Sequence, residues 1–149
     1  MKKLIAIDCG KMYMKARCND KVVIYENKYS EKHYIDNKKT NWNVVYENNN
    51  YFIGEHAEDG DWREGKASEF HIVSALTCIT RFLNSEEIND DIVIIYGDSV
   101  DLFFDIKNKQ DIINAFEGKH KINISGEEFI FTITKVHVLP EGYGCIFSN

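Results

Sequence analysis

The fold is decided by one stretch near the N-terminus, Leu4-Ile-Ala-Ile-Asp-Cys-Gly-Lys-Met-Tyr-Met-Lys15. Apolar residues fill its first four positions, which is typical of a strand buried on both faces. The strand ends at Asp8, and Gly10 permits a tight turn whose bare backbone N–H can approach a ligand. The chain then continues outward as a second strand, so the sequence opens with a hairpin.

The charged side chains of this hairpin suggest a ligand. Asp8 lies at the end of the first strand, where its carboxylate could hold a hydrated divalent cation. Lys15 follows Lys11 by an even number of residues, so it could share the face of Lys11 on the outgoing strand and bring a positive charge back. A carboxylate, a glycine turn and a lysine on one hairpin indicate a phosphate and metal site, although most Asp-x-Gly turns are only structural.

The composition is that of an ordinary globular domain of 149 residues, with 44% apolar and 28% charged residues. Its net charge of −6 disfavours a direct nucleic-acid surface, because such surfaces use Lys and Arg to neutralise phosphates. No apolar run of the sequence approaches the ~20 residues of a membrane span, and the apolar stretch before Asp8 is too short for a secretory signal. We therefore expect a cytoplasmic protein without direct nucleic-acid or membrane partners.

The cysteines and histidines do not have the spacing of metal ligands. The four cysteines are widely scattered, without a C-x-x-C pair, and we interpret them as buried reduced thiols; they are Cys9, Cys18, Cys78 and Cys145. The five histidines are equally dispersed. His71 falls on a predicted helix, where a satisfied or exposed histidine is a better interpretation than a ligand.

The first half of the chain predicts strands separated by a polar segment. A third strand over 21–25 completes a β-meander with the hairpin. Residues 26 to about 66 are then rich in Asn, Lys, Glu and Asp, and we expect them to form a small insertion beside the main sheet. The strand-like runs of this insertion are 42–46 and 51–53, joined by a turn at 47–50.

The second half of the chain predicts helices alternating with strands. A helix over about 68–83 would begin at Ser68 as N-cap and place an apolar stripe on the core. The apolar run 91–96 is typical of a central parallel strand covered on both faces. A second helix over 108–117 would begin at Asn108 as N-cap. Further strands are expected at 121–124, 129–133 and 136–139.

This order of elements predicts a mixed α/β sheet of about five strands with helices packed against it. Two of the predicted strands lead into an acid with a glycine close behind, at Asp8 and at Glu141. In open α/β sheets, ligands collect beyond the carboxyl ends of the strands. The two acids therefore mark a candidate site together.

Five segments, in the right order, resemble the actin, sugar-kinase and heat-shock-chaperone superfamily, and in particular its ParM-like branch. The first segment, Asp8 to Lys15, is similar to the phosphate-binding hairpin D-x-G-x-x-x-x-K. The others are similar to the Y-x-x-G-E-x-A strand, the strand ending in G-L-P-V, the G-K-H segment and the V-x-V-x-P-E-G-x-G segment; they are 51–57, 94–101, 118–120 and 136–144.

The resemblance covers the whole chain and implies an actin-like ATPase domain. Such a domain has a ribonuclease H-like mixed sheet with flanking helices and a small inserted subdomain. Its core would comprise residues 1–25 and 67–149, and the subdomain would comprise about 26–66.

The resemblance also implies a function. Actin-like ATPases of this branch polymerise into filaments, most often to segregate plasmid DNA through an adaptor protein. ATP (or GTP) and Mg2+ would lie in a cleft between two similar domains. Asp8 would lie near the Mg2+ and the phosphates. Gly10 and Lys11 would form the turn at the phosphates, and Lys15 would contact them. Glu141 would orient the water that attacks the γ-phosphate.

Two features depart from the family pattern. Gly97-Asp-Ser-Val100 lacks the Leu-Pro of the family, so the loop after the central strand is altered. The chain also stops at Asn149, where a second domain with the other phosphate loop would begin, so we expect ATP hydrolysis only together with that domain. Three interpretations stay open: the first half of a ParM-like filament ATPase, a naturally short actin-like domain that binds filaments without catalysis, and an unrelated α/β domain.

Overall fold

The computed structural model describes residues 2–30, 42–54, 57 and 66–142; Cys145 and parts of the expected insertion lie outside these ranges. The strands are β1 (Lys3–Cys9), β2 (Tyr13–Cys18), β3 (Lys21–Glu26), β4 (Tyr29–Ser30), β5 (Trp42–Tyr46), β6 (Asn49–Ile53), β7 (Ile88–Asp98), β8 (Gly118–Ile124) and β9 (Glu127–Pro140). The helices are α1 (Glu69–Thr80), α2 (Val100–Phe103) and α3 (Ile106–Phe116). The strands form one nine-stranded sheet in the order β3-β2-β1-β7-β9-β8-β5-β6-β4.

The opening meander is confirmed, because β1, β2 and β3 pair antiparallel in sequence order. The register places Asp8 directly opposite Lys15. The turn between the first two strands closes when the Gly10 N–H donates to the Tyr13 carbonyl at 3.0 Å. A Cβ at Gly10 would lie 2.8 Å from that carbonyl oxygen, so the turn requires glycine.

β7 is an interior strand of the sheet and runs parallel to both of its neighbours, β1 and β9, as the apolar run 91–96 predicts. The strands predicted at 129–133 and 136–139 prove to be one continuous strand, β9. β8 pairs with the first half of β9, and β7 accompanies β9 as far as Pro140. The polar residues between the two apolar runs therefore remain in the strand.

The strands of the polar segment extend the same sheet at its far edge. β5 pairs antiparallel with β8, and β6 and β4 follow it. The predicted turn between β5 and β6 is confirmed: Glu47 and Asn48 have φ values of 48° and 66°, a backbone that asparagine adopts more readily than most residues. The sheet has more strands than predicted because these strands belong to it.

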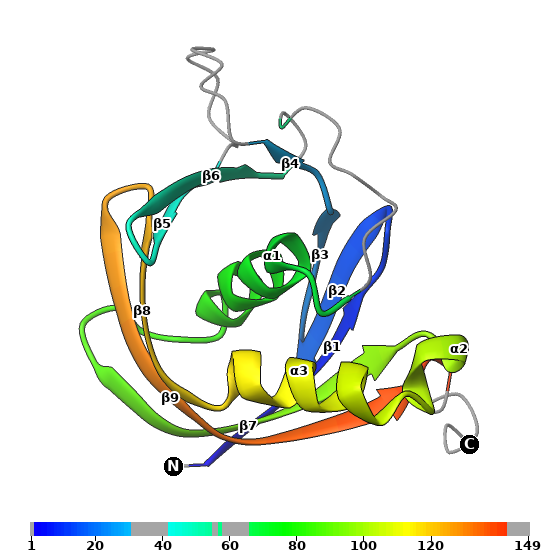
Figure 1. Cartoon of the computed structure of the whole chain (residues 1–149). Helices are drawn as coiled ribbons and strands as arrows, with labels where there is room; N and C mark the ends of the chain where they lie inside the picture. Colours follow the sequence, from blue (N-terminus) through cyan, green and yellow to red (C-terminus); the bar gives the residue numbers. More distant parts are fainter. Residues whose placement is uncertain (1, 31–41, 55–56, 58–65, 143–149) are drawn as a thin grey trace.

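Figure 1 shows that the sheet curls around α1, and that α3 lies on the same, concave side. All residues of α1 from Phe70 to Thr80 are buried, because this helix meets protein on every side. On α3, Ile112 and Phe116 are buried, and the Phe116 ring lies 5.0 Å from the ring of Tyr96 on β7. The hydrophobic core therefore fills the inside of the curl.

The prediction that the first strand is buried on both sides is wrong, because the outer face of the opening strands is exposed. Ile5 and Ile7 point into the core, but Leu4 is 53% exposed, and Val22 and Ile24 on β3 are 55% and 60% exposed. Both long helices pack on the concave side, and no element of the described ranges covers the outer face of β1, β2 and β3. One apolar face of these strands consequently meets solvent.

The second long helix begins earlier than predicted. Its N-cap is Asp105, whose side chain accepts a hydrogen bond from the Asn108 backbone N–H at 3.1 Å. Asn108, the predicted N-cap, lies inside the helix and donates its side-chain amide to Asp98. For the first helix, Ser68 is the N-cap as predicted, although its side chain contacts His71 instead of a backbone N–H. None of the helices within the described ranges has the length and apolar character needed to cross a membrane.

Candidate functional site

Three neighbouring strands, β1, β7 and β9, end at one edge of the sheet and bring the two predicted acids together. Asp8 on β1 pairs with Gly97 on β7, and Gly97 pairs in turn with Leu139 on β9, two residues before Glu141. A Cβ at Gly97 would lie 4.0 Å from both the Asp8 Cα and the Glu141 Cγ. Asp8 and Glu141 thus flank a point on the middle strand that carries no side chain.

Lys66 joins these two carboxylates. Its ammonium nitrogen lies 3.5 Å from Asp8 Oδ1, donates to the Gly97 carbonyl at 2.9 Å, and forms a close ion pair with Glu141 Oε1. The Lys66 residue is only 8% exposed, whereas the side chains of Asp8 and Glu141 are 51% and 43% exposed. The lysine therefore approaches from the protein side, and the acids can be reached from solvent.

The backbone around this cluster holds Lys66 and Glu141 in place. The buried Tyr96 hydroxyl donates to the Lys66 carbonyl at 3.0 Å, and the Glu141 N–H donates to the Asp98 carbonyl at 2.7 Å. The Asp98 side chain points the other way and accepts from the Ser99 N–H and the Asn108 amide. Burial raises the pKa of Asp98 above its ordinary value, which these two hydrogen bonds oppose. Asp98 thereby holds the loop after β7, which contains Ser99, against α3.

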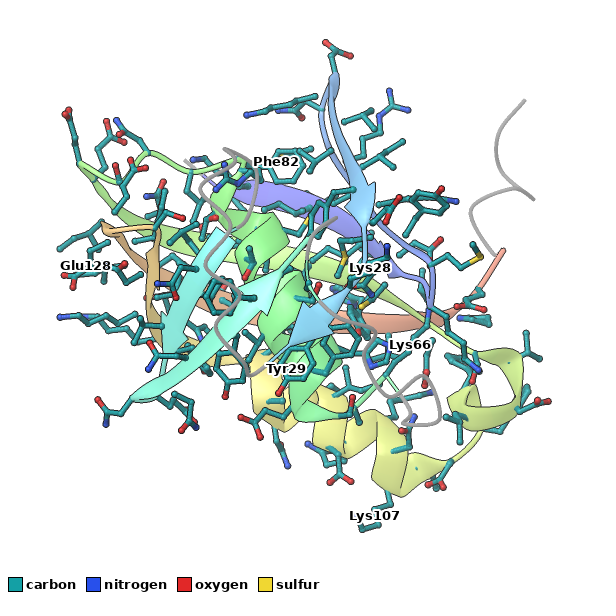
Figure 2. The ribbon with its side chains drawn as sticks, turned by 90° about the horizontal axis from the view of Figure 1, so that it is seen from above. Lys28, Tyr29, Lys66, Phe82, Lys107 and Glu128 are labelled. Atoms are coloured by element: carbon teal, nitrogen blue, oxygen red, sulfur yellow. The ribbon has the colours of Figure 1, made fainter. Side chains whose placement is uncertain are left out.

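A groove of about 630 Å³ opens beside the two acids on the outer face of the sheet. Asp8, Lys15 and Glu141 line it, together with apolar residues of the neighbouring strands such as Ile24 and Leu139. Figure 2 shows Lys66 toward the side of the molecule where β9 ends, opposite Glu128 near the start of that strand. The groove therefore combines charged groups at the strand ends with an apolar floor.

Gly10 and Lys11 do not line this groove. The Gly10 N–H, which the sequence suggested as a ligand donor, is used by the Tyr13 carbonyl, and its carbonyl accepts from the Asn27 side chain at 2.7 Å. Lys11 is exposed at the hairpin turn. The structure thus brings together Asp8, Lys15 and Glu141 but leaves Gly10 and Lys11 outside the groove. The Gly10 N–H already donates to the Tyr13 carbonyl within the turn.

His71, His120 and Cys9 have contacts or burial that indicate structural roles. His71 Nδ1 lies 2.9 Å from the Ser68 hydroxyl, and burial lowers the His71 pKa to about 4. His120 contacts the Tyr46 hydroxyl and the Phe116 carbonyl, and burial lowers its pKa as well. Burial raises the pKa of the Cys9 thiol to about 12, which keeps it protonated. Among the described residues, no three or more His, Cys, Asp or Glu side chains form a metal cluster.

The residues at the strand ends nevertheless fit a hydrated divalent cation. Hard cations such as Mg2+ prefer carboxylate oxygens and keep several waters, so they need few protein ligands. Asp8 and Glu141 offer such oxygens at the solvent-accessible strand ends, and no side chain projects from Gly97 beside them. A positive charge, the Lys66 ammonium, already lies within reach of both carboxylates.

Lys66 is the site residue that the sequence did not reveal. It follows Gly65 in the polar segment just before α1, and its neighbours show no motif. Lysines in polar segments are usually solvated, so only a long-range contact distinguishes this one. The single available signal was the position of Lys66 two residues before Ser68, the N-cap of α1, and this signal is not specific.

Comparison with known proteins matches residues 6–144 to the family described as actin-like proteins, N-terminal domain. No curated protein matches the chain significantly. Among solved structures, the AlfA filament bound to AMPPNP is 20% identical over 98% of this chain and 57% of that chain, with a TM-score of 0.77. The AlfA filament from the B. subtilis plasmid pLS32 is 19% identical over 97% and 58%, with a TM-score of 0.76. The pCBH ParM non-polymerisable quadruple mutant is 24% identical over 100% and 49%, with a TM-score of 0.74.

At these identities the likeness to the solved structures shows the fold, and this chain spans about half the length of each of those chains. The resemblance seen in the five sequence segments is confirmed, and so is the actin-like mixed sheet. Because the family model covers nearly the whole sequence, the chain belongs to the actin-like proteins and corresponds to their N-terminal domain.

Proposed function

We propose that this domain supplies one half of an Mg2+–nucleotide site. The observation that carries the proposal is the meeting of Asp8 and Glu141 on either side of Gly97, at the ends of three adjacent strands and at the mouth of a groove. In sheets of this kind, ligands lie beyond the carboxyl ends of the strands. The nucleotide phosphates and their cation would therefore lie over Gly97.

Each charged residue has a role in this proposal. Asp8 holds the hydrated Mg2+ that accompanies the phosphates. Lys15, opposite Asp8 on the neighbouring strand, adds positive charge for the phosphates, and the Gly10–Lys11 turn borders them. Glu141 orients the water that attacks the γ-phosphate, a task of positioning that needs a carboxylate at a fixed point.

We further propose that the complete protein is an ATPase or GTPase that assembles into filaments. Support comes from the solved structures of the same fold, one of which is a filament bound to AMPPNP and another a filament encoded by a plasmid. Plasmid segregation through an adaptor protein in the cytoplasm is the corresponding cellular role. A second candidate is a stand-alone domain that binds another protein without catalysis. The exposed apolar face of β1 and β3 favours that alternative.

Nucleotide titration of this chain tests the proposal. One half-site on an open surface should bind Mg2+·ATP in the roughly millimolar range, ~4 kcal/mol. We expect Asp8→Ala to weaken this binding, measured by NMR shifts of the amides near residues 8–15 and 97. Lys107→Ala, which removes an exposed charge on α3, should leave it unchanged. Equal affinity of Asp8→Ala and the original chain would place the site elsewhere.

The role of Glu141 is tested in a protein that also contains the second domain. There, Glu141→Gln should lower phosphate release at saturating nucleotide while nucleotide affinity stays within a few fold, because the residue acts on the water. Normal turnover without this carboxylate would remove Glu141 from the mechanism.

A further inference from the structure

Lys66 is a buried lysine that contacts two solvent-accessible carboxylates, those of Asp8 and Glu141. Its ammonium lies within reach of Asp8 and Glu141, and it also donates to the Gly97 carbonyl. A lysine that is only 8% exposed is costly unless it is paired. The two half-exposed carboxylates therefore supply the charge that keeps Lys66 buried, and Lys66 supplies the charge that lets them lie close together.

We propose that the Lys66 ammonium is a built-in counter-ion that competes with a divalent cation for Asp8. The inference deepens the proposed function and rests on it only in taking Asp8 as the cation ligand. Two positive charges within ~4 Å of one carboxylate oxygen repel each other strongly in a partly buried site. A cation can therefore take Asp8 only if the ammonium gives up that contact.

The geometry indicates which contact is released. The Asp8 contact is the longest of the three, at 3.5 Å, whereas the Gly97 carbonyl is at 2.9 Å and Glu141 is closer still. The Tyr96 hydroxyl donates to the Lys66 carbonyl, which holds the Lys66 backbone beside the site while the side chain changes its contacts. When a cation binds Asp8, the ammonium retains Glu141 and Gly97, and it holds the Glu141 carboxylate away from the cation. The same lysine thus sets the cation affinity and positions Glu141.

The experiment measures binding of Mn2+ alone, followed by electron paramagnetic resonance and by thermal unfolding of this chain with and without the ion. Lys66→Met retains the apolar stem and removes the charge. We expect it to bind Mn2+ at least tenfold more tightly than the original chain, and Asp8→Asn in the same background to abolish the gain. The matched control is Lys107→Met, which removes a lysine from an exposed ion pair on α3, away from Lys66. It should leave Mn2+ binding unchanged.

A second comparison keeps the test decisive if Lys66→Met alone does not fold. Lys66→Met/Glu141→Gln removes the whole ion pair, which costs less than removing one partner, and it is compared with Glu141→Gln alone. Removing Lys66 should again raise the Mn2+ affinity. An unchanged or lower affinity in the folded variants would overturn the proposal and make Lys66 a purely structural or a cation-assisting residue. Because no nucleotide is present, this outcome would leave the nucleotide titration of Asp8→Ala to decide the proposed function by itself.

Discussion

Gly97 is the smallest residue at the strand ends, and the geometry of the site depends on it. It lies on the middle strand, where any side chain on the groove side would come between Asp8 and Glu141. Its carbonyl is also one of the three acceptors of Lys66. Because Gly97 has no side chain and offers its carbonyl, Asp8 and Glu141 can share the Lys66 ammonium.

His71 shows how a single buried residue makes stability depend on pH. Burial first, and the charges of Lys66 and Lys11 second, lower its pKa from 6.5 to about 4. As the pH falls, His71 binds a proton near pH 6.5 in the unfolded chain but only near pH 4 in the folded chain. Stability that is complete above pH 6.5 is therefore lost as the pH falls through this window, by up to ~3 kcal/mol.

We expect His71→Gln to flatten the profile of unfolding free energy against pH between about 4 and 6.5. The measurement is urea unfolding at a series of pH values, in which the slope is compared and not the absolute stability. His137→Gln is the control, because His137 is exposed on β9. A residual slope from His120 is expected in every variant, since its pKa is also lowered by burial. Identical slopes for His71→Gln and His137→Gln would contradict the assignment.

The strands of the opening meander are elements with two unlike faces. Ile5 on β1 is fully buried against the concave core, whereas Ile24 on β3 is 60% exposed on the opposite face of the sheet. Both positions carry the same side chain, so the sequence alone does not show that they contribute differently to the free energy of unfolding. The free energy of burying an apolar side chain is proportional to the area removed from water, so their contributions should differ widely.

A matched pair of substitutions tests this difference. Ile24→Thr should change the free energy of unfolding by about 0.5 kcal/mol or less, because the site is largely exposed and threonine retains β-branching. Ile5→Thr should cost about 2 kcal/mol or more, because it removes buried carbon and places a hydroxyl in the core. Urea unfolding of both variants decides it. A comparable loss at both positions would mean that the outer face is covered in solution.

The molecule as a whole is a curled sheet with a filled inner side and a partly bare outer side. The inner side holds α1 and α3, and the groove with its acids opens on the outer side. The chain spans about half the length of the solved actin-like chains that share its fold. The exposed apolar face and the groove with its two acids therefore lie on the same side of the sheet.

This arrangement predicts the assembly behaviour of the chain. Head-to-tail filaments need two complementary surfaces on every subunit, and we expect this chain alone to supply only part of them. It should therefore remain free of long filaments when Mg2+·ATP is added, as measured by light scattering and electron microscopy. A longer protein that also contains the second domain is the positive control. Filaments formed by this chain at the concentration at which the longer protein assembles would show that the first domain is sufficient.

Several features could be predicted from the sequence because they depend on neighbouring residues. The meander follows from alternating apolar runs and the turn at Gly10, and β7 follows from its continuous apolar run. The positions of Asp8 and Glu141 at strand ends follow from the strand boundaries. Once these boundaries are known, the parallel order of β1, β7 and β9 is enough to bring the two acids to one edge.

Other features were decided only by the tertiary structure. Residues distant in the sequence place Lys66 between Asp8 and Glu141, and no local pattern encodes that contact. The Gly10 amide is consumed by the turn, which depends on the exact backbone path. An apolar strand shows in its sequence that both faces can be buried, but which face is covered depends on where the helices pack. In this protein both long helices pack on the concave side, so the outer face of β1 and β3 stays exposed, and the candidate site opens there.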